Sequence, residues 1–306
     1  MNIWFISKYS TCPPKYSKGG RSRLFSLAKE MRKLGNQVLL LTSDSNHGSS
    51  FPETKKTYNY DIEDDLPIIW IKTTKYKKTA SIRRVLSWID FELKLFFMPI
   101  KSMESPDVII VSSLSIFSII YGYYLKKKFN CFLVFEIRDI WPLAMTEEGG
   151  FSKNHPLVLF IGIIEKFGYK NADLIVGTVP KLDKHVINIL GYDKPFFCSP
   201  QGFDPKKYLT DEVFDTSMFQ KYVHKDRAII GYAGSIGISN ALQIFIDTIK
   251  LMKDNLDIYF LIVGSGDLKQ KYEEELAGYC NVSFLPKIEQ DMVKNFLSIC
   301  DMLYLS

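Results

Sequence analysis

Glycine-rich turns ahead of helical patterns are the most chemically suggestive feature of this 306-residue sequence. One turn, Gly231–Gly237, contains three glycines between an apolar run and a helical pattern, and Val263–Gly266 follows the next apolar run in the same way. Glycines let a ligand approach the backbone, and the free amides and dipole of a helix N-terminus attract an anion. We therefore expect a phosphate-type ligand on these turns, and tight turns that hold no ligand are the alternative.

A glycine pair, Gly19-Gly20 followed by Arg21, stands between the first apolar run and the first helical pattern. Its spacing differs from the dinucleotide-binding pattern G-x-G-x-x-G, and only Asp44 ends the second apolar run with a carboxylate that would suit a ribose. The pair is open to two interpretations, an anion-binding loop or a flexible strand–helix turn.

Charged residues end another apolar run at Glu136, Arg138 and Asp139. Charges at the end of a buried strand have to be paired or solvated in a cleft. These residues predict either a catalytic group or an ion pair of Arg138 with Asp139 or Glu136 that holds the loop. His155, which precedes Pro156 at an expected helix start, is better suited to capping that helix.

The segment 72–101 combines eight Lys and Arg residues with only two acidic ones, and aromatic residues lie between them. A basic, aromatic helix is typical of contact with an anionic membrane surface, and a solvated basic face above a core-facing side is the alternative. A nucleic-acid partner is not expected, because no recognisable nucleic-acid-binding module accompanies the charge.

The elements that must position these residues are those of an α/β protein, because short apolar runs alternate with helical patterns. Fully apolar strands indicate a parallel sheet that is covered on both faces. The predicted strands are 2–7, 37–42, 68–72, 108–112, 132–137, 174–177, 228–233, 258–263, 282–285 and 302–306. The predicted helices are 21–34, 81–103, 114–128, 156–171, 180–190, 241–253, 268–277 and 290–300.

These elements predict two Rossmann-like domains, 1–200 and 228–306, joined by a connection over 201–227. We expect the second domain to be incomplete, because a doubly wound domain normally has more than four strands and does not stop on a buried one. The apolar stretch 108–125 is interrupted by serines and a glycine, so it predicts a buried strand and a helix rather than a membrane span.

The bulk composition is that of a globular protein, with 46% hydrophobic and 24% charged residues and a formal net charge of +5. Its five cysteines are widely spaced and form no C-x-x-C pair, which argues against a disulfide framework or a zinc site. The cysteine usage fits a reducing compartment, and the short apolar N-terminus has no basic region of a signal peptide.

Taken in order, these segments resemble nucleotide-sugar-dependent glycosyltransferases of the GT-B fold, specifically the retaining family 4. The resemblance covers essentially the whole chain and includes Gly19-Gly20 and the two later glycine turns. Gln201-Gly202-Phe203-Asp204 resembles a short segment that the family places between its domains. Phe135–Pro142 resembles the E-x-R-D-x-W-P segment of members that build bacterial surface polysaccharides, including the N-acetylfucosamine transferase-like group.

The resemblance implies a role for each domain and its residues. The first domain would bind the acceptor through Gly19, Gly20 and Arg21, and the second would bind the donor. The implied donor-binding residues are Gly234, Ser235, Gly237, Gly264, Gly266 and Lys287, and the implied catalytic residues are Arg138, Asp139 and Glu136.

The chain also departs from the family pattern. Arg138-Asp139 stands where many members have a catalytic histidine, and Ser235 and Asn240 replace a donor-binding arginine and lysine. Lys287 is then the best remaining cation for the diphosphate. The family's glutamate pair would lie beyond Ser306, which agrees with an incomplete second domain.

The implied reaction is retaining transfer of a hexose-type sugar from a nucleoside diphosphate donor, UDP-linked, to a lipid-linked acceptor of O-antigen or capsule synthesis. We expect no metal and no further cofactor. The expected location is cytoplasmic and peripheral at the inner face of the plasma membrane, through contact of 72–101 with anionic lipid. An inactive truncated remnant, a non-catalytic fragment that binds sugar nucleotides, and a GT-B sugar epimerase are the alternatives.

Overall fold

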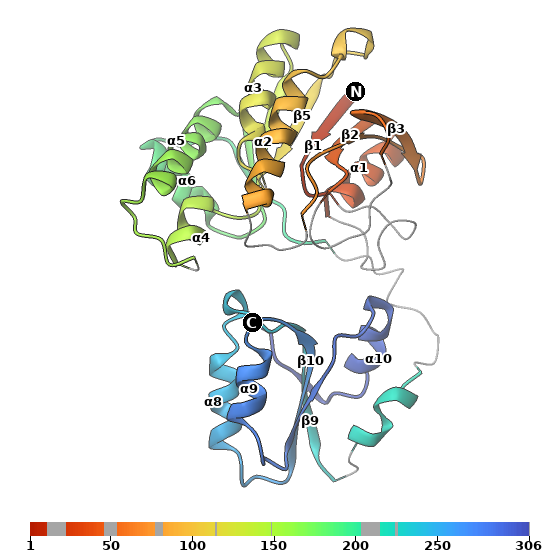
Figure 1. Cartoon of the computed structure of the whole chain (residues 1–306), viewed down its shortest axis with the longest axis vertical. Coiled ribbons are helices and arrows are strands. Elements are labelled where there is room, and N and C mark those ends of the chain that lie inside the picture. Colours follow the sequence, from red (N-terminus) through yellow and green to blue (C-terminus); the bar gives the residue numbers. More distant parts are fainter. Residues whose placement is uncertain are drawn as a thin grey trace. The chain divides into compact units, whose positions relative to one another are not determined.

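The computed structural model describes residues 1–10, 23–45, 54–76, 82–113, 115–147, 149–202, 215–223 and 226–305. The chain divides into two compact units, Met1–Phe203 (unit 1) and Asp204–Ser306 (unit 2), each of which is an α/β structure (Figure 1). The predicted fold class is confirmed. The predicted acceptor residues Gly19, Gly20 and Arg21 lie outside the described residues, as do Phe203 and Asp204 of the segment after the first domain.

Within the described residues, unit 1 contains one sheet of eight strands in the order β3-β4-β2-β1-β5-β6-β7-β8. The strands are β1 (Asn2–Ile6), β2 (Gln37–Ser43), β3 (Tyr58–Glu63), β4 (Leu66–Ile71), β5 (Val108–Ser112), β6 (Phe132–Ile137), β7 (Leu174–Gly177) and β8 (Phe196–Cys198). All neighbouring strands are parallel except β3 and β4. The central strands are apolar runs that are buried on both faces, which is why their sequence signal is strong.

Two edge strands differ from the sequence prediction. β3, which was not predicted, pairs with β4 through a two-residue turn at Asp64 and Asp65, both with positive φ (47° and 64°) as in a type I′ hairpin turn. Its sequence alternates polar and apolar residues at a half-exposed edge and has no apolar run. β8 has only three residues, and none of them is fully buried.

Helices cover the sheet of unit 1 on both faces (Figure 1). On one face, α2 (Ile82–Phe96), α3 (Ser118–Phe129), α5 (Pro156–Asn171) and α6 (Leu182–Leu190) pack on the larger core. On the other, α1 (Arg23–Lys33) buries Leu24, Phe25 and Ala28 against β1, β2 and β4. The unpredicted short helix α4 (Trp141–Glu147) begins within the segment Phe135–Pro142.

In the described part of unit 2, four parallel strands form a sheet in the order β11-β10-β9-β12. They are β9 (Ala228–Ser235), β10 (Ile258–Ser265), β11 (Val282–Leu285) and β12 (Met302–Leu303). The helices α8 (Gln243–Leu251) and α9 (Lys269–Glu275) pack on one face, and α10 (Val293–Leu297) packs on the other (Figure 1). The expectation of a buried strand over 302–306 is wrong, because β12 has only two residues and both are exposed.

No helix in the described part of the chain is long and apolar enough to cross a membrane. The stretch 108–125 is β5 followed by α3, as predicted. His155 caps α5 as expected, since its Nδ1 accepts a hydrogen bond from the Leu157 amide at 3.2 Å.

Two glycines of α5 allow a test of how tightly this helix packs on the sheet. A Cβ on Gly168 would lie 2.6 Å from Cε1 of Phe135, whereas a Cβ on Gly162 would meet nothing within 4 Å. We expect Gly168→Ala to lower the free energy of unfolding by roughly 1–3 kcal/mol through overpacking. Gly162→Ala should raise it by up to about 1 kcal/mol through helix propensity. Urea denaturation followed by circular dichroism measures both, and equal effects would contradict this packing.

Candidate functional site

The carboxyl ends of β1 and β5 are where the fold of unit 1 favours a ligand. β2, β4 and β3 lie on one side of β1, and β5 to β8 lie on the other, so the direction of strand addition reverses between β1 and β5. Open α/β sheets bind ligands at such a reversal, beyond the carboxyl ends of the strands. The residues that follow these two strands therefore form the candidate site of unit 1.

Lys8, two residues after β1, has a fully buried side chain. Its ammonium donates to the Ser45 carbonyl at 3.1 Å and lies over the rings of Tyr9 and Tyr76, at 4.8 and 5.5 Å from their centroids. Loss of hydration lowers the pKa of Lys8 to about 7, although the nearby carboxylates of Glu92 and Asp44 act in the opposite direction.

Glu92 of α2 holds the opposite charge in the same region. Its Oε1 accepts hydrogen bonds from the hydroxyls of Ser115 and Ser118, at 2.9 and 2.6 Å. Burial of the carboxyl raises the pKa of Glu92 to about 7, against the lowering effects of these two hydroxyls and of Lys8. Lys8 and Glu92 therefore titrate in the same range, and each favours the charged form of the other.

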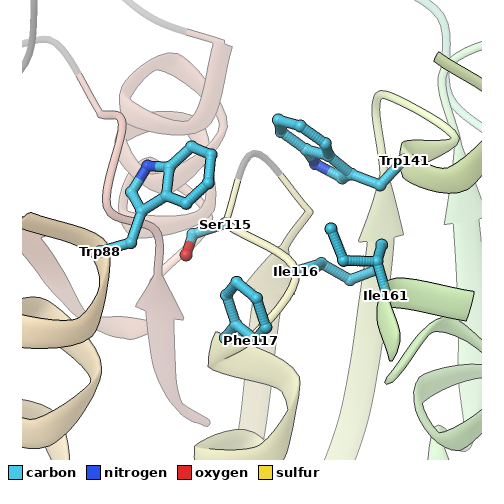
Figure 2. Close-up of a pocket in the computed structure, with 6 residues that line it drawn as sticks. All are labelled: Trp88, Ser115, Ile116, Phe117, Trp141 and Ile161. Atoms are coloured by element: carbon cyan, nitrogen blue, oxygen red, sulfur yellow. The ribbon is translucent and has the colours of Figure 1, made fainter. Parts of the chain in front are cut away.

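A small pocket, here called the aromatic pocket, has Ser115, a hydrogen-bond partner of Glu92, in its lining (Figure 2). It is lined by Trp88, Ser115, Ile116, Phe117, Trp141 and Ile161, which come from α2, the segment between β5 and α3, α4 and α5. In Figure 2 the two indoles lie on either side of the pocket and Phe117 lies below them. The Trp88 and Trp141 rings meet edge to face, with centroids 5.8 Å apart.

Hydrogen bonds fix both indoles of the aromatic pocket. Trp141 Nε1–H donates to the Ser113 carbonyl at 2.6 Å, and Trp88 Nε1–H donates to the Tyr9 hydroxyl. Because Tyr9 and Ser113 follow β1 and β5, the sheet itself positions both rings. The pocket is thus built from the carboxyl edge of the sheet and is held in place before any ligand binds.

Glu136, which was predicted as catalytic, forms an ion pair in the interior. Its Oε1 accepts from Arg23 Nε at 2.9 Å, and the two side chains are 3% and 4% exposed. Arg23 also donates from Nη2 to the carbonyl and hydroxyl of Ser199, both at 2.7 Å, and from Nη1 to the Pro200 carbonyl. The predicted pairing of Glu136 with Arg138 is wrong, because Arg23 of α1 occupies that position and ties the end of β6 to the segment after β8.

Arg138 and Asp139 remain closer to solvent than Glu136. Arg138 is partly exposed and forms no ion pair with any residue that the structure describes, so the predicted Arg138–Asp139 pair is also wrong. The Arg138 amide donates to the Ser113 hydroxyl at 2.9 Å, which fixes the backbone at the end of β6. Asp44 is fully buried and paired with Lys75 at 2.8 Å, so its carboxylate supports the fold rather than a ribose.

In unit 2, the two glycine turns lie against each other at the carboxyl ends of β9 and β10. The pairing of these strands continues through Gly264 with Gly234 and Ser265 with Ser235. A Cβ on Gly264, whose φ is +154°, would lie 1.9 Å from the Gly234 carbonyl oxygen. Packing between the turns therefore explains this glycine without a ligand, and the same holds for Gly266, where a Cβ would lie 2.2 Å from the Ile236 carbonyl oxygen.

Gly237 differs from these glycines, because a Cβ there would meet only the Ser235 hydroxyl oxygen, at 3.6 Å. Its backbone is extended (φ −127°, ψ 176°), a conformation that any residue adopts. Gly234 and Ser235 are exposed, and Lys287 is an exposed cation two residues after β11. The predicted donor-binding residues thus lie in or directly after the last residues of three adjacent strands of the sheet of unit 2.

Lys269 is a second cation at this edge, and sequence reasoning missed it. Its ammonium donates to the carbonyls of Gly264 at 3.1 Å and Leu285 at 2.5 Å, which joins the ends of β10 and β11. The sequence signal was its place in the first turn of the helix that follows Val263–Gly266. Lys8, Glu92 and Arg23 were missed as well, because each takes its meaning from partners that are distant in the sequence.

The buried Arg23–Glu136 pair generates a prediction about stability. Arg23→Met leaves the Glu136 carboxylate buried without its cation, and we expect the free energy of unfolding to fall by about 3–5 kcal/mol. Lys29→Met in the same helix is the matched control, since Lys29 pairs with Asp64 near the surface and should cost less than about 1 kcal/mol. Urea denaturation of both variants measures these changes in the free energy of unfolding. A loss in Arg23→Met no larger than in the control would show that the buried pair does not stabilise unit 1.

No protein-family model and no curated protein sequence matches the chain. Solved structures match it over its whole length at low identity. Sucrose-phosphate synthase from Thermosynechococcus elongatus has a TM-score of 0.69 and 13% identity over 99% of this chain and 74% of its own. The catalytic domain of starch synthase IV from Arabidopsis thaliana, bound to ADP and acarbose, has a TM-score of 0.69 and 12% identity over 99% and 77% of the two chains.

A third similar structure is HepE of Anabaena in complex with UDP-glucose, with a TM-score of 0.61 and 16% identity over 100% of this chain and 74% of its own. At such identities the likeness concerns the fold. It extends through both units, and the chain has the fold of two Rossmann-like domains, GT-B, that these proteins share.

Proposed function

We propose that this protein is a glycosyltransferase that moves a sugar from a nucleoside diphosphate sugar to an acceptor, with the donor on unit 2 and the acceptor on unit 1. The fold supports this assignment, since the similar structures include a sucrose-phosphate synthase and a starch synthase bound to ADP, and the HepE structure holds UDP-glucose. Within this scheme we assign the reaction to the retaining class and the acceptor to a lipid-linked sugar of bacterial surface polysaccharide.

The observation that carries the proposal is the edge of unit 2 where β9, β10 and β11 end. There the exposed residues Gly234, Ser235 and Gly266 lie on paired turns, and Lys287 follows the neighbouring strand. Backbone amides and a lysine are the groups that bind a diphosphate. Lys269 holds the ends of two of these strands together, so that the edge is already formed when the donor arrives.

In this reaction, breaking the bond between the sugar and the diphosphate places negative charge on the leaving group. Lys287 and the amides of the turns would stabilise that charge, which lowers the barrier without a strong base. On unit 1, Arg138 and Asp139 are the candidates for contact with the reacting sugar, because they lie at the end of β6 and are not buried in the core. Glu136 acts through Arg23 as a support for this edge.

The donor site can be tested by isothermal titration with UDP, UDP-glucose and ADP on the full chain. We expect at least one of them to bind, and Lys287→Ala to weaken that binding roughly 10-fold or more, because a charge-assisted hydrogen bond is lost. Lys253→Ala is the matched control, since this exposed lysine follows α8 and lies away from the predicted donor residues. Binding of none of the nucleotides would refute the proposal, and an equal loss in both variants would remove Lys287 from the site.

We also propose the contact with an anionic membrane that the sequence predicts for 72–101, and the surface of α2 supports it. Its outward side chains are largely apolar and exposed, with exposed fractions of 53% for Ile89, 54% for Leu93 and 44% for Phe96. Phe97, directly after the helix, is 78% exposed, and Arg83 is an exposed cation on the same helix. A solvated basic face would instead turn polar groups outward, so this surface favours contact with an anionic membrane.

Flotation with vesicles that contain phosphatidylglycerol tests this contact. We expect the full chain to float with anionic vesicles, and Ile89→Glu to lower the bound fraction roughly 10-fold, because an apolar contact is replaced by a charge of the same sign as the lipid. Ile244→Glu, at a 69% exposed isoleucine of α8 in unit 2, is the control and should float like the unaltered protein. Absence of the unaltered protein from the floating fraction would exclude membrane contact through α2.

A further inference from the structure

We propose that the aromatic pocket is an acceptor subsite that receives a methyl group carried by a sugar. This rests on the proposed function, since it names the substituent that the acceptor would present to unit 1. The acetamido group and the 6-deoxy carbon are the two sources of such a methyl group. Six residues line the pocket (Figure 2).

The indoles limit what the pocket can recognise. The only hydrogen-bond donors of the Trp88 and Trp141 rings are already used, by the Tyr9 hydroxyl and the Ser113 carbonyl. The rings therefore present carbon atoms alone to a ligand. Aromatic carbon surfaces of this kind favour contact with C–H groups over a hydroxyl, which would lose hydrogen bonds to water there.

Ser115 is the one polar side chain among the six lining residues, and it is also engaged. Its hydroxyl donates to Glu92 Oε1 at 2.9 Å, and Ser118 of the same turn donates to the same oxygen at 2.6 Å. These two hydrogen bonds connect the segment that carries Ile116 and Phe117 to α2. Among the lining residues that the structure describes, none carries a charged side chain.

The size of the pocket excludes larger apolar groups. Within the pocket, the centre of a water-sized sphere can move through only about 10 Å³. A cavity needs about 10–15 Å³ by this measure to hold one water molecule, so the pocket has room for a single small group. A methyl group can enter while the rest of the sugar stays outside, and a lipid chain would not fit.

The position of the pocket is that of an acceptor subsite. Its lining residues follow β5 and β6 or lie on helices that meet there, beside the reversal of strand order between β1 and β5. Arg138 and Asp139, the candidates for contact with the reacting sugar, immediately precede Ile140-Trp141. Arg138 and Asp139 precede Trp141 by only three and two positions. A sugar whose methyl group lies under Trp141 would therefore lie near these two residues.

Two pairs of free sugars test the proposal by saturation-transfer NMR on the full chain. N-acetylglucosamine is compared with N-formylglucosamine, and D-fucose with D-galactose, so that each pair differs at the proposed methyl group. We expect the methylated sugar of at least one pair to bind about fourfold more tightly, the factor that burial of one methyl-sized group gives. Its methyl protons should receive the strongest saturation.

Three variants connect this preference to the pocket. In Trp88→Leu the ratio of the two dissociation constants should fall to about 1, and in Trp88→Phe, which keeps an aromatic ring, it should fall only in part. Phe197→Leu is the control, since Phe197 is a 62% exposed aromatic residue of β8 outside the pocket. Because both constants are measured on one sample, a loss of folded protein lowers both signals and leaves their ratio unchanged.

A ratio of 1 in the unaltered protein for both sugar pairs overturns the proposal, and so does a ratio that survives Trp88→Leu. Failure of all four sugars to bind has the same consequence. The titrations with nucleotides are independent of these measurements. Methyl-selective sugar binding without nucleotide binding would therefore reject the glycosyltransferase assignment and leave the pocket as a sugar site.

Discussion

Burial of parallel strands on both faces is the constraint on which the rest of this structure depends. The central strands of unit 1 are covered by α1 on one side and by α2, α3, α5 and α6 on the other. No polar chemistry can take place on faces that are filled with apolar side chains, so it is displaced to the strand ends. Lys8, Glu136 and the serines after β5 all lie at such ends, and they define the candidate site of unit 1.

Charges at these ends are stabilised by partners rather than by water. Arg23 and Glu136 are almost fully buried and share an ion pair, while Arg23 also binds two carbonyls after β8. Lys8 and Glu92 are held by hydrogen bonds, and burial brings both pKa values to about 7. Loss of Arg23 would leave the Glu136 carboxylate buried without its partner at a cost of several kcal/mol, so this pair fixes the geometry at the end of β6.

The two units use their edges differently. In unit 1 the edge is rich in side chains, with two indoles that line a small apolar pocket and with the buried groups of Lys8 and Glu92. In unit 2 the edge consists mainly of backbone, because the glycine turns after β9 and β10 lie against each other and leave little room for side chains. A backbone edge with two lysines suits an anion, and an aromatic edge suits a sugar. This division agrees with a donor on one unit and an acceptor on the other.

The sequence by itself determined the fold class and most elements, because a strand that is buried on both faces is recognisable as a continuous run of apolar residues. β5, β6, β7 and α5 have the predicted bounds, whereas the polar edge strand β3 and the three-residue β8 escaped prediction for want of such a run. The partners of charged residues were decided only by the tertiary structure. Glu136 pairs with Arg23, 113 positions away, and not with Arg138, because the fold brings the first residue of α1 to the end of β6.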